Sequence, residues 1–311
     1  MKILRDMNEP VLVIAFNRPE EFERLLARLR EIQPKHVYVA VDGPREGHQT
    51  DFEGVCRTRD LVKSIDWQCN VKTLFREVNL GCGLGVSSAI TWFFENVDRG
   101  IILEDDLVPD PSFFPFCTEL LERYENDPRV FAISGCNYAP PSEQSSADAY
   151  RFSRVPHIWA WATWKRSWQK YQLDIGGWRN QLPTKKLWNA GGRSISGFTY
   201  WMTTFDLLAR KQIDTWDGQL VFAAMRTDGL TATSNVNLVE NLGFGESATH
   251  TKRTPRHLRQ VEPIELPTTP IRVAVDERAD AWTRRHHFEA TLPGFVQQGT
   301  RYLKQLLRRN K

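Results

Sequence analysis

The chain has 311 residues, of which 41% are apolar and 25% are charged, and its formal net charge at pH 7 is +3. These values are typical of a globular protein and exclude a disordered or fibrous chain. No apolar run approaches the roughly 18 residues that a membrane span needs, and the first ten residues lack the apolar stretch of a secretory signal. We therefore expect the protein on the cytoplasmic side of any membrane.

Strand and helix signals alternate along the first half of the chain. Residues 10–16 (PVLVIAF) are a short apolar run that predicts a strand, and apolar residues at helical spacing over 20–29 predict a helix. Further along, the same alternation predicts strands at 36–42, 70–76 and 100–103, and helices at 52–65 and 85–98. Strands separated by helix-length segments imply an α/β fold with a parallel, doubly wound sheet.

The pattern changes after residue 133. Residues 134–150 are rich in Ser, Pro, Gly and Ala, which predicts a long loop. The second half predicts helices at 165–172, 195–211 and 218–227 and a short strand at 230–234. Residues 251–311 hold 13 Lys or Arg against 6 Asp or Glu. Because this basic surplus lies at one end and has no recognition motif, we expect no nucleic-acid partner.

Ligands of such sheets bind at the carboxyl ends of the strands. The residues at these ends are Asn17-Arg18, Asp42-Gly43 and Glu104-Asp105-Asp106. Three adjacent carboxylates repel one another unless a cation lies among them, and their hard oxygen atoms suit Mg²⁺ or Mn²⁺. The alternative is a solvated acidic loop that precedes a helix near Asp110. The chain has no G-x-x-x-x-G-K-[ST] sequence, so we do not expect a P-loop ATPase.

Four segments, PVLVIAFNRPE, VAVDG, NLGCGLG and ILEDD, together resemble the GT-A fold glycosyltransferases. This group includes N-acetylglucosaminyltransferase I and bacterial family 2-like sugar transferases, and the resemblance covers residues 8–250. It implies a Rossmann-like GT-A fold with a mostly parallel sheet and a helical and loop acceptor region. It also implies a nucleotide-diphospho-sugar donor, most commonly UDP-linked, a Mn²⁺ or Mg²⁺ ion, and inverting transfer to a hydroxyl group.

We divide the chain accordingly into a donor-binding half at 8–135, an acceptor-binding and catalytic half of the same domain at 136–250, and a basic extension at 251–311. By the same resemblance, Arg18 and Asp42 contact the nucleotide, with Asp42 at the uracil edge. Asp42 could equally stabilise the turn that follows it, and Arg18 could pair with a surface acid.

The resemblance also assigns roles to the three adjacent acids. Asp105 faces the ribose, Asp106 ligates the metal, and Glu104 completes the acidic triad that orients the leaving diphosphate. The metal neutralises the negative charge that develops on this diphosphate.

An inverting transfer needs a group opposite the leaving group that takes the proton of the acceptor hydroxyl. Asp214 and Asp217, in the segment IDTWDGQ, are the candidates. The Trp-Asp pair resembles the segment that holds the catalytic base in this family, and Asp217 matches it better than Asp214. Helix capping is the alternative role of Asp217, because an apolar periodic run follows.

Two further segments bear on the ligands. The run HIWAWATW at 157–164 holds three tryptophans, which we expect near the acceptor because aromatic faces suit sugar rings; a half-buried strand beneath the cleft is the alternative. By analogy with GT-A enzymes that use a late loop, His250 is expected to be a further metal ligand. Lys252 or Arg253 is then expected on the phosphates.

Residues 295–311 predict a short basic amphipathic helix that could rest on an anionic membrane surface, as a peripheral contact, or pack on its own domain. The expected function is therefore a metal-dependent inverting glycosyltransferase acting on a glycan, polysaccharide or lipid-linked acceptor. The alternatives are a nucleotidyltransferase, a nucleotide-sugar hydrolase and a non-catalytic carbohydrate-binding protein.

Overall fold

The computed structural model describes residues 7–244, 259–266 and 269–291. The strands in this part of the chain are β1 (Val11–Ala15), β2 (His36–Val41), β3 (Asn70–Phe75), β4 (Arg99–Glu104), β5 (Leu107–Pro109), β6 (Val130–Ser134), β7 (Tyr150–Ser153), β8 (Trp161–Trp164), β9 (Leu230–Ser234) and β10 (Val239–Asn241). The α-helices are α1 (Pro19–Ile32), α2 (Gln49–Leu61), α3 (Gly81–Asn96), α4 (Phe113–Arg123), α5 (Lys165–Trp168), α6 (Trp178–Gln181), α7 (Thr184–Ala190), α8 (Ile195–Ala209), α9 (Asp217–Arg226) and α10 (Glu277–His286).

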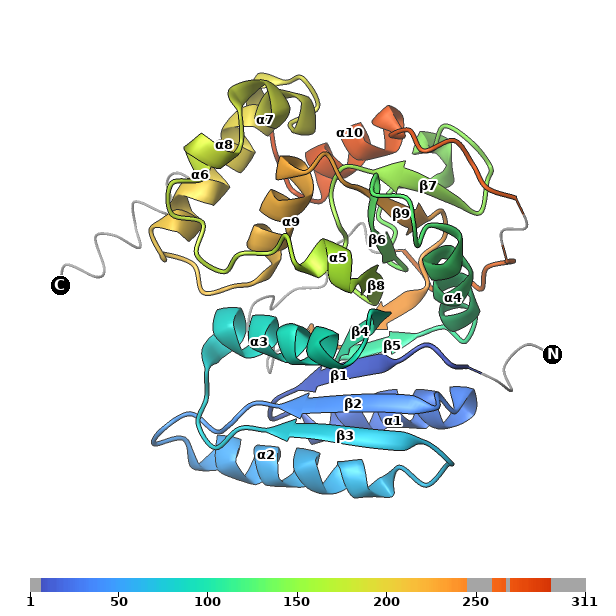
Figure 1. The fold of residues 1–311 in the computed structure, drawn as a ribbon, viewed down its shortest axis with the longest axis vertical. Coiled ribbons are helices and arrows are strands. Elements are labelled where there is room, and N and C mark those ends of the chain that lie inside the picture. Colours follow the sequence, from blue (N-terminus) through green and yellow to red (C-terminus); the bar gives the residue numbers. More distant parts are fainter. Residues whose placement is uncertain (1–6, 245–258, 267–268, 292–311) are drawn as a thin grey trace.

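The centre of the described part is an eight-stranded sheet in the order β3-β2-β1-β4-β8-β6-β9-β7 (Figure 1). Strands β1 to β4 are parallel, and β6 and β9 run in the same direction as them. Only β8 and β7 run the other way. Strands β5 and β10 form a separate antiparallel pair. The predicted α/β class, with a mostly parallel sheet flanked by helices, is confirmed.

Helices cover both faces of the sheet. Apolar residues of α1, α2 and α4 form one cluster with Val11 and Val13 of β1. Residues of α3, α5 and α9 form a second cluster with Leu12 and Ile14 on the opposite face. All of β1 is buried, which explains its unbroken apolar sequence, because a parallel strand covered on both faces has no solvent side. Helices α6 to α9 contribute to a third cluster and gather at one end of the molecule (Figure 1).

The tryptophan-rich run at 157–164 contains the central strand β8. Trp161 and Trp164 are buried, and the indole Nε1 of Trp164 donates to the carbonyl oxygen of Leu121 at 3.1 Å. Residues 161–164 are thus a strand in the core, which is the alternative that the sequence left open, and these two tryptophans offer almost no exposed surface to a ligand. Trp159 precedes the strand and keeps part of its surface exposed.

Helix α10 lies in the segment that we predicted as a basic extension. The carboxylate Oδ1 of Asp276 accepts hydrogen bonds from the backbone N–H groups of Arg278 and Ala279, both at 3.1 Å, and so caps the helix. Val275 pairs with Phe152 of β7. Part of this extension is therefore fixed to the sheet edge. The expected basic helix at 295–311 lies outside the described residues.

Two properties of the described residues concern the environment of the protein. No helix among them has the length and apolar character needed to cross a bilayer. All five cysteines of the chain are free thiols.

His157 is a buried histidine between β7 and β8. Its Nε2 atom has no hydrogen-bond partner among the described residues, while its carbonyl oxygen accepts a hydrogen bond from Ser134 Oγ at 2.6 Å. The ring of Tyr138 meets the imidazole edge-on, with the ring centroids 4.9 Å apart. Burial, and then the charges of His287 and Arg151, hold the pKa of His157 well below its usual 6.5. His157 is therefore neutral in the folded protein.

This neutral imidazole predicts a stability that decreases in acid. Below about pH 6.5 the unfolded chain binds a proton at His157 that the folded chain does not bind, so the contribution is complete above this pH and is lost as the pH falls. His157→Phe should therefore show a smaller loss of unfolding free energy between about pH 7 and pH 5 than the wild type. Urea denaturation at the two pH values measures this loss, and the control is His36→Phe, which replaces an exposed histidine. An unchanged pH dependence in His157→Phe would contradict the assignment.

The packing of α3 against the sheet can be tested with two matched truncations. Phe93 of α3 is fully buried and contacts Tyr38 with ring centroids 5.0 Å apart, whereas Phe52 of α2 is 54% exposed. Phe93→Ala should lower the unfolding free energy by about 3–5 kcal/mol, because it leaves a cavity. Phe52→Ala should change it by less than about 0.5 kcal/mol. Similar losses in both variants would show that α3 does not pack as described.

Candidate functional site

The three adjacent acids form a turn between β4 and β5, and we call residues 104–106 the acidic turn. Strands β1 and β4 pair so that Ile14 lies opposite Glu104. The backbone N–H of Phe16, just past β1, donates to Asp105 Oδ2 at 2.9 Å. This register brings the two strand ends together, as parallel neighbours at one sheet edge require.

Arg18 is the cation that lies among the acids. Its Nη1 atom is 2.5 Å from Asp106 Oδ2 and 3.6 Å from Asp105 Oδ1. The sequence left two roles open for Arg18, a nucleotide contact and an ion pair with a surface acid. The structure shows an ion pair, but with the buried Asp105 and the partly buried Asp106 at the strand end rather than with an exposed acid.

One guanidinium does not balance three carboxylates. Burial, and then the charges of its two neighbours in the turn, raise the pKa of Glu104 to about 8. Burial and the charge of Asp106 likewise raise the pKa of Asp105 to about 7, against the opposing effect of Arg18. Near pH 7 bound protons therefore relieve part of the repulsion in the acidic turn, and a further cation would replace these protons and favour the ionised carboxylates.

The acidic turn suits a divalent ion chemically, but it is not a complete cage. The described residues hold no group of three or more His, Cys, Asp or Glu side chains arranged for a metal ion. Asp105 Oδ2 is already taken by a backbone N–H group. Mg²⁺ in enzymes commonly takes only one or two carboxylates and completes its shell with water and substrate phosphate oxygens. Glu104 and Asp106 fit that arrangement. His250, Lys252 and Arg253 lie outside the described residues.

Asp42 fixes the connection that leads to α3. Its Oδ1 atom accepts from the N–H of Gly43 at 3.1 Å, and its Oδ2 atom accepts from the N–H of Leu80 at 3.0 Å. Burial raises the pKa of Asp42 despite these hydrogen bonds. A Cβ atom on Gly43 would lie 2.4 Å from the backbone of Val78, so only glycine fits there. The turn-stabilising role that we left open for Asp42 is thus observed.

Asp214 binds the beginning of α3. Its two carboxylate oxygens accept hydrogen bonds from the backbone N–H groups of Cys82 at 3.0 Å and Gly83 at 2.9 Å. Cβ atoms on Gly81 or Gly83 would lie 2.7 Å from these oxygens. The helix starts at Gly81 rather than at the predicted residue 85, because Asp214 satisfies N–H groups that the first helical turn leaves unpaired.

Asp217 is the first residue of α9, next to the loop that Asp214 anchors. Its Oδ1 atom accepts from Thr215 Oγ1 at 2.5 Å and from the N–H of Gly218 at 2.7 Å. Its Oδ2 atom accepts no hydrogen bond from the described residues. Trp216 stacks on the buried Trp161, with ring centroids 5.7 Å apart, and so fixes the loop from below.

Asp217 interacts electrostatically with the acidic turn. The charge of Asp217 contributes to the raised pKa of Glu104, after burial and the other two acids of the turn. Burial, and then the charges of Glu104, Asp217 and Asp214, raise the pKa of the Cys82 thiol to about 12. Cys82 is thus a protonated thiol that experiences the charges of Glu104, Asp214 and Asp217, and sequence reasoning gave no signal for it.

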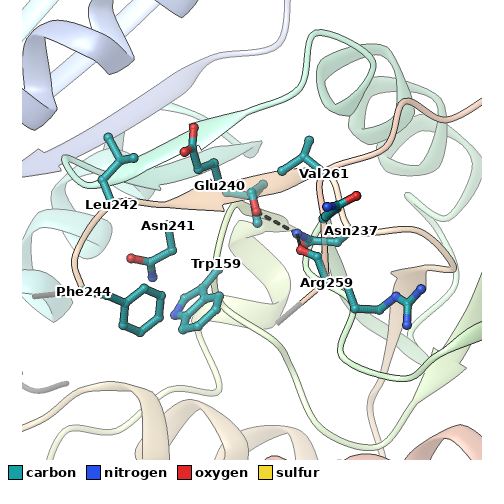
Figure 2. Close-up of a pocket in the computed structure, with 10 residues that line it drawn as sticks. Trp159, Asn237, Glu240, Asn241, Leu242, Phe244, Arg259 and Val261 are labelled. Atoms are coloured by element: carbon teal, nitrogen blue, oxygen red, sulfur yellow. Dashed lines mark hydrogen bonds between the residues drawn. The ribbon is translucent and has the colours of Figure 1, made fainter. Parts of the chain in front are cut away.

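A cavity of about 570 Å³, whose lining residues Figure 2 shows, lies next to the acidic turn in the fold. The backbone N–H of Leu242 donates to the carbonyl oxygen of Asp106 at 2.8 Å, which attaches one wall of the cavity to the turn. The lining residues among those described are Trp159, Asn237, Val239, Glu240, Asn241, Leu242, Phe244, Arg259, Gln260 and Val261. Apart from Trp159, no role was predicted for these residues from the sequence.

No protein-family model and no curated protein sequence matches the chain. Similar solved structures include HddC from Yersinia pseudotuberculosis, at 10% identity over 50% of this chain and 77% of that one, with a TM-score of 0.32. The inositol-1-phosphate CTP transferase from T. maritima is 9% identical over 53% of this chain and 74% of that one, with a TM-score of 0.32. Mouse xyloside xylosyltransferase 1 is 12% identical over 70% of this chain and 81% of that one, with a TM-score of 0.33. At these values the similarities assign neither a reaction nor a substrate to this chain.

The contact between Asp214 and α3 can be tested through stability. Asp214→Ala should lower the free energy of unfolding by about 1 kcal/mol, because it removes a side-chain acceptor from the helix start. Asp214→Asn keeps one acceptor oxygen and should lose less. The control is Asp60→Ala, which removes an exposed acid paired with Lys63 and should stay within about 0.5 kcal/mol of wild type. Equal effects of the two alanine variants in urea denaturation would argue against the capping contact.

Proposed function

We propose that the protein is a divalent-metal-dependent glycosyltransferase that moves a sugar, with inversion, from a UDP-linked donor to a hydroxyl group of a glycan acceptor. The observation that carries this proposal is the pairing of two separate acidic groups. The acidic turn lies at the carboxyl end of β4, and Asp217, at the start of α9, lies close enough for its charge to act on Glu104. Transfer of a sugar from a diphosphate needs a cation-binding group at the leaving phosphate and an independent base.

The donor lies along the carboxyl ends of β2, β1 and β4 in this proposal, which are neighbours in the sheet. Asp42 lies at the base of the nucleotide, Arg18 beside its phosphates, and Asp105 at the ribose. Asp106, with Glu104, holds the metal, which supplies positive charge to the departing diphosphate when it is bound. This arrangement of the donor is supported by the sheet order, in which the ends of β2, β1 and β4 follow one another.

Asp217 is the base in this proposal. Thr215 and Gly218 hold its Oδ1 atom, which leaves Oδ2 available to accept a proton from the acceptor hydroxyl. As that proton leaves, the acceptor oxygen forms a bond to the anomeric carbon, and the bond from this carbon to the diphosphate oxygen breaks. Asp214 is the weaker candidate because N–H groups of α3 occupy both of its oxygens. Its proposed role is to position the loop that carries Asp217.

The roles of His250, Lys252 and Arg253 stay predictions. In the proposal His250 adds a ligand to the metal, and Lys252 or Arg253 contacts the phosphates. None of these residues is needed for the argument from the acidic turn and Asp217.

Two matched substitutions separate donor binding from chemistry. With Mn²⁺, UDP should raise the melting temperature of the wild type more than GDP, dTDP or CDP, and EDTA should abolish the shift, since a ligand that binds only the folded state stabilises it. Asp106→Asn should lose this shift. Asp217→Asn should keep it but lower the transfer rate by about 10²–10⁴-fold, because a general base is removed. Asp98→Asn, which changes a 95% exposed acid, should keep both.

The products distinguish the alternatives. Release of pyrophosphate from a nucleoside triphosphate and a sugar phosphate would identify a nucleotidyltransferase. Release of free sugar without an acceptor would identify a hydrolase. The absence of any metal-dependent nucleotide shift would contradict the donor site altogether.

A further inference from the structure

The cavity beside the acidic turn lies on the side away from the proposed nucleotide position. The sheet order places β2, β1, β4 and β8 side by side. Because β8 is antiparallel to β4, its beginning lies at the edge where the parallel strands end, and Trp161 pairs with Ile102. Two residues before Trp161, Trp159 therefore lies near the level of Glu104, the first residue of the acidic turn. Asp42 lies at the same edge, but beyond β1 from the turn.

Two aromatic rings form a corner of this cavity. The ring centroids of Trp159 and Phe244 are 5.6 Å apart, and the ring planes are inclined at 69° (Figure 2). Tyr138 meets Trp159 edge-on, with centroids 5.6 Å apart, and so holds the indole in place. A corner of two inclined rings offers apolar surface to a ligand with an apolar face, but it does not enclose a flat base between parallel rings.

Amide groups complete the polar side of the cavity. Asn237 Nδ2 donates to the carbonyl oxygens of Val239 at 2.9 Å and Arg259 at 3.0 Å, which ties the two walls together. Asn241 Oδ1 accepts from the N–H of Gly243 at 2.7 Å, and its Nδ2 donates to no described residue. Figure 2 shows the Asn241 amide near the two aromatic rings. Neutral amide donors next to aromatic faces suit a ligand that carries both hydroxyl groups and apolar C–H surface.

The cavity adjoins the reacting groups of the proposed function. A Cβ atom on Gly243 would lie 2.1 Å from Asp106 Oδ2, so this wall touches the acidic turn directly. The volume of about 570 Å³ lies within the usual range for small-molecule sites. A ligand here lies next to the proposed donor phosphates without occupying the nucleotide position.

We propose that this cavity binds a pyranose ring of the acceptor glycan, with its apolar face on Trp159 and Phe244 and a hydroxyl oxygen accepting from Asn241 Nδ2. The assignment to the acceptor rests on the proposed glycosyl transfer, whereas the assignment to a pyranose rests on the cavity itself. Glu240 lies on the same wall, but it is half exposed and pairs with Arg24 at 3.4 Å. Glu240 and Arg259 are the charged residues of the described lining and their formal charges cancel, so the ring that we propose is that of a neutral sugar.

The binding experiment needs neither a nucleotide nor turnover. Saturation-transfer NMR with methyl glycosides of glucose, galactose, mannose and N-acetylglucosamine should show transfer from the wild-type protein to at least one of them, and none to glycerol. Trp159→Ala and Phe244→Ala should lose this transfer. The matched control Trp188→Ala, which truncates a 37% exposed tryptophan on α7, should retain it. Absence of transfer to all four glycosides, or its retention in Trp159→Ala, would overturn the proposal.

Kinetics separate a failure of the cavity from a failure of the proposed function. If transfer occurs, Trp159→Ala should raise KM for the acceptor by about tenfold, which corresponds to about 1.4 kcal/mol, and leave the nucleotide-induced shift unchanged. An unchanged acceptor KM would remove the cavity from the acceptor site and leave the transferase standing. Glycoside binding that depends on Trp159, in a protein without transfer activity, would overturn the transferase and keep the sugar site.

Discussion

Repulsion among the three carboxylates after β4 is the constraint on which the site depends. The pairing of β1 with β4 delivers one cation, Arg18, and the packing around the turn excludes much of the water that would otherwise screen the charges. Folding therefore leaves a repulsion at this edge that either protons or a bound cation can relieve. Sites that bind charged substrates commonly keep such a locally unfavourable arrangement, which the rest of the fold outweighs.

The strands and helices that could be predicted from the sequence are those that a local hydrophobic pattern determines. Strands β1 and β2 are buried on both faces and therefore appear as unbroken apolar runs, and β9 was predicted at its observed bounds. Strand β7 was missed because it is short and contains Arg151, which is buried and donates to Asn137 and Asn235. Such a strand depends on partners that are distant in the sequence, and no local pattern reveals them.

The same distinction between local patterns and distant contacts applies to the residues of the candidate site. The acids at the ends of β2 and β4 could be located, because strand ends follow from strand patterns. The contact of Asp214 with α3 could not, since it spans more than a hundred residues of chain. In the tryptophan-rich run, residue type alone did not decide which ring faces solvent. The pairing of β8 with its neighbours buries Trp161 and leaves Trp159 at the cavity.

The position of β8 in the sheet has a consequence for how the chain is made. This strand joins β4 to β6, yet it follows both of them in the sequence. During synthesis the apolar edge of β4 therefore stays without its neighbour until residues 161–164 have left the ribosome. An open edge of this kind invites pairing with other nascent chains. The second half of the sheet can thus join the first only after β8 has been synthesised.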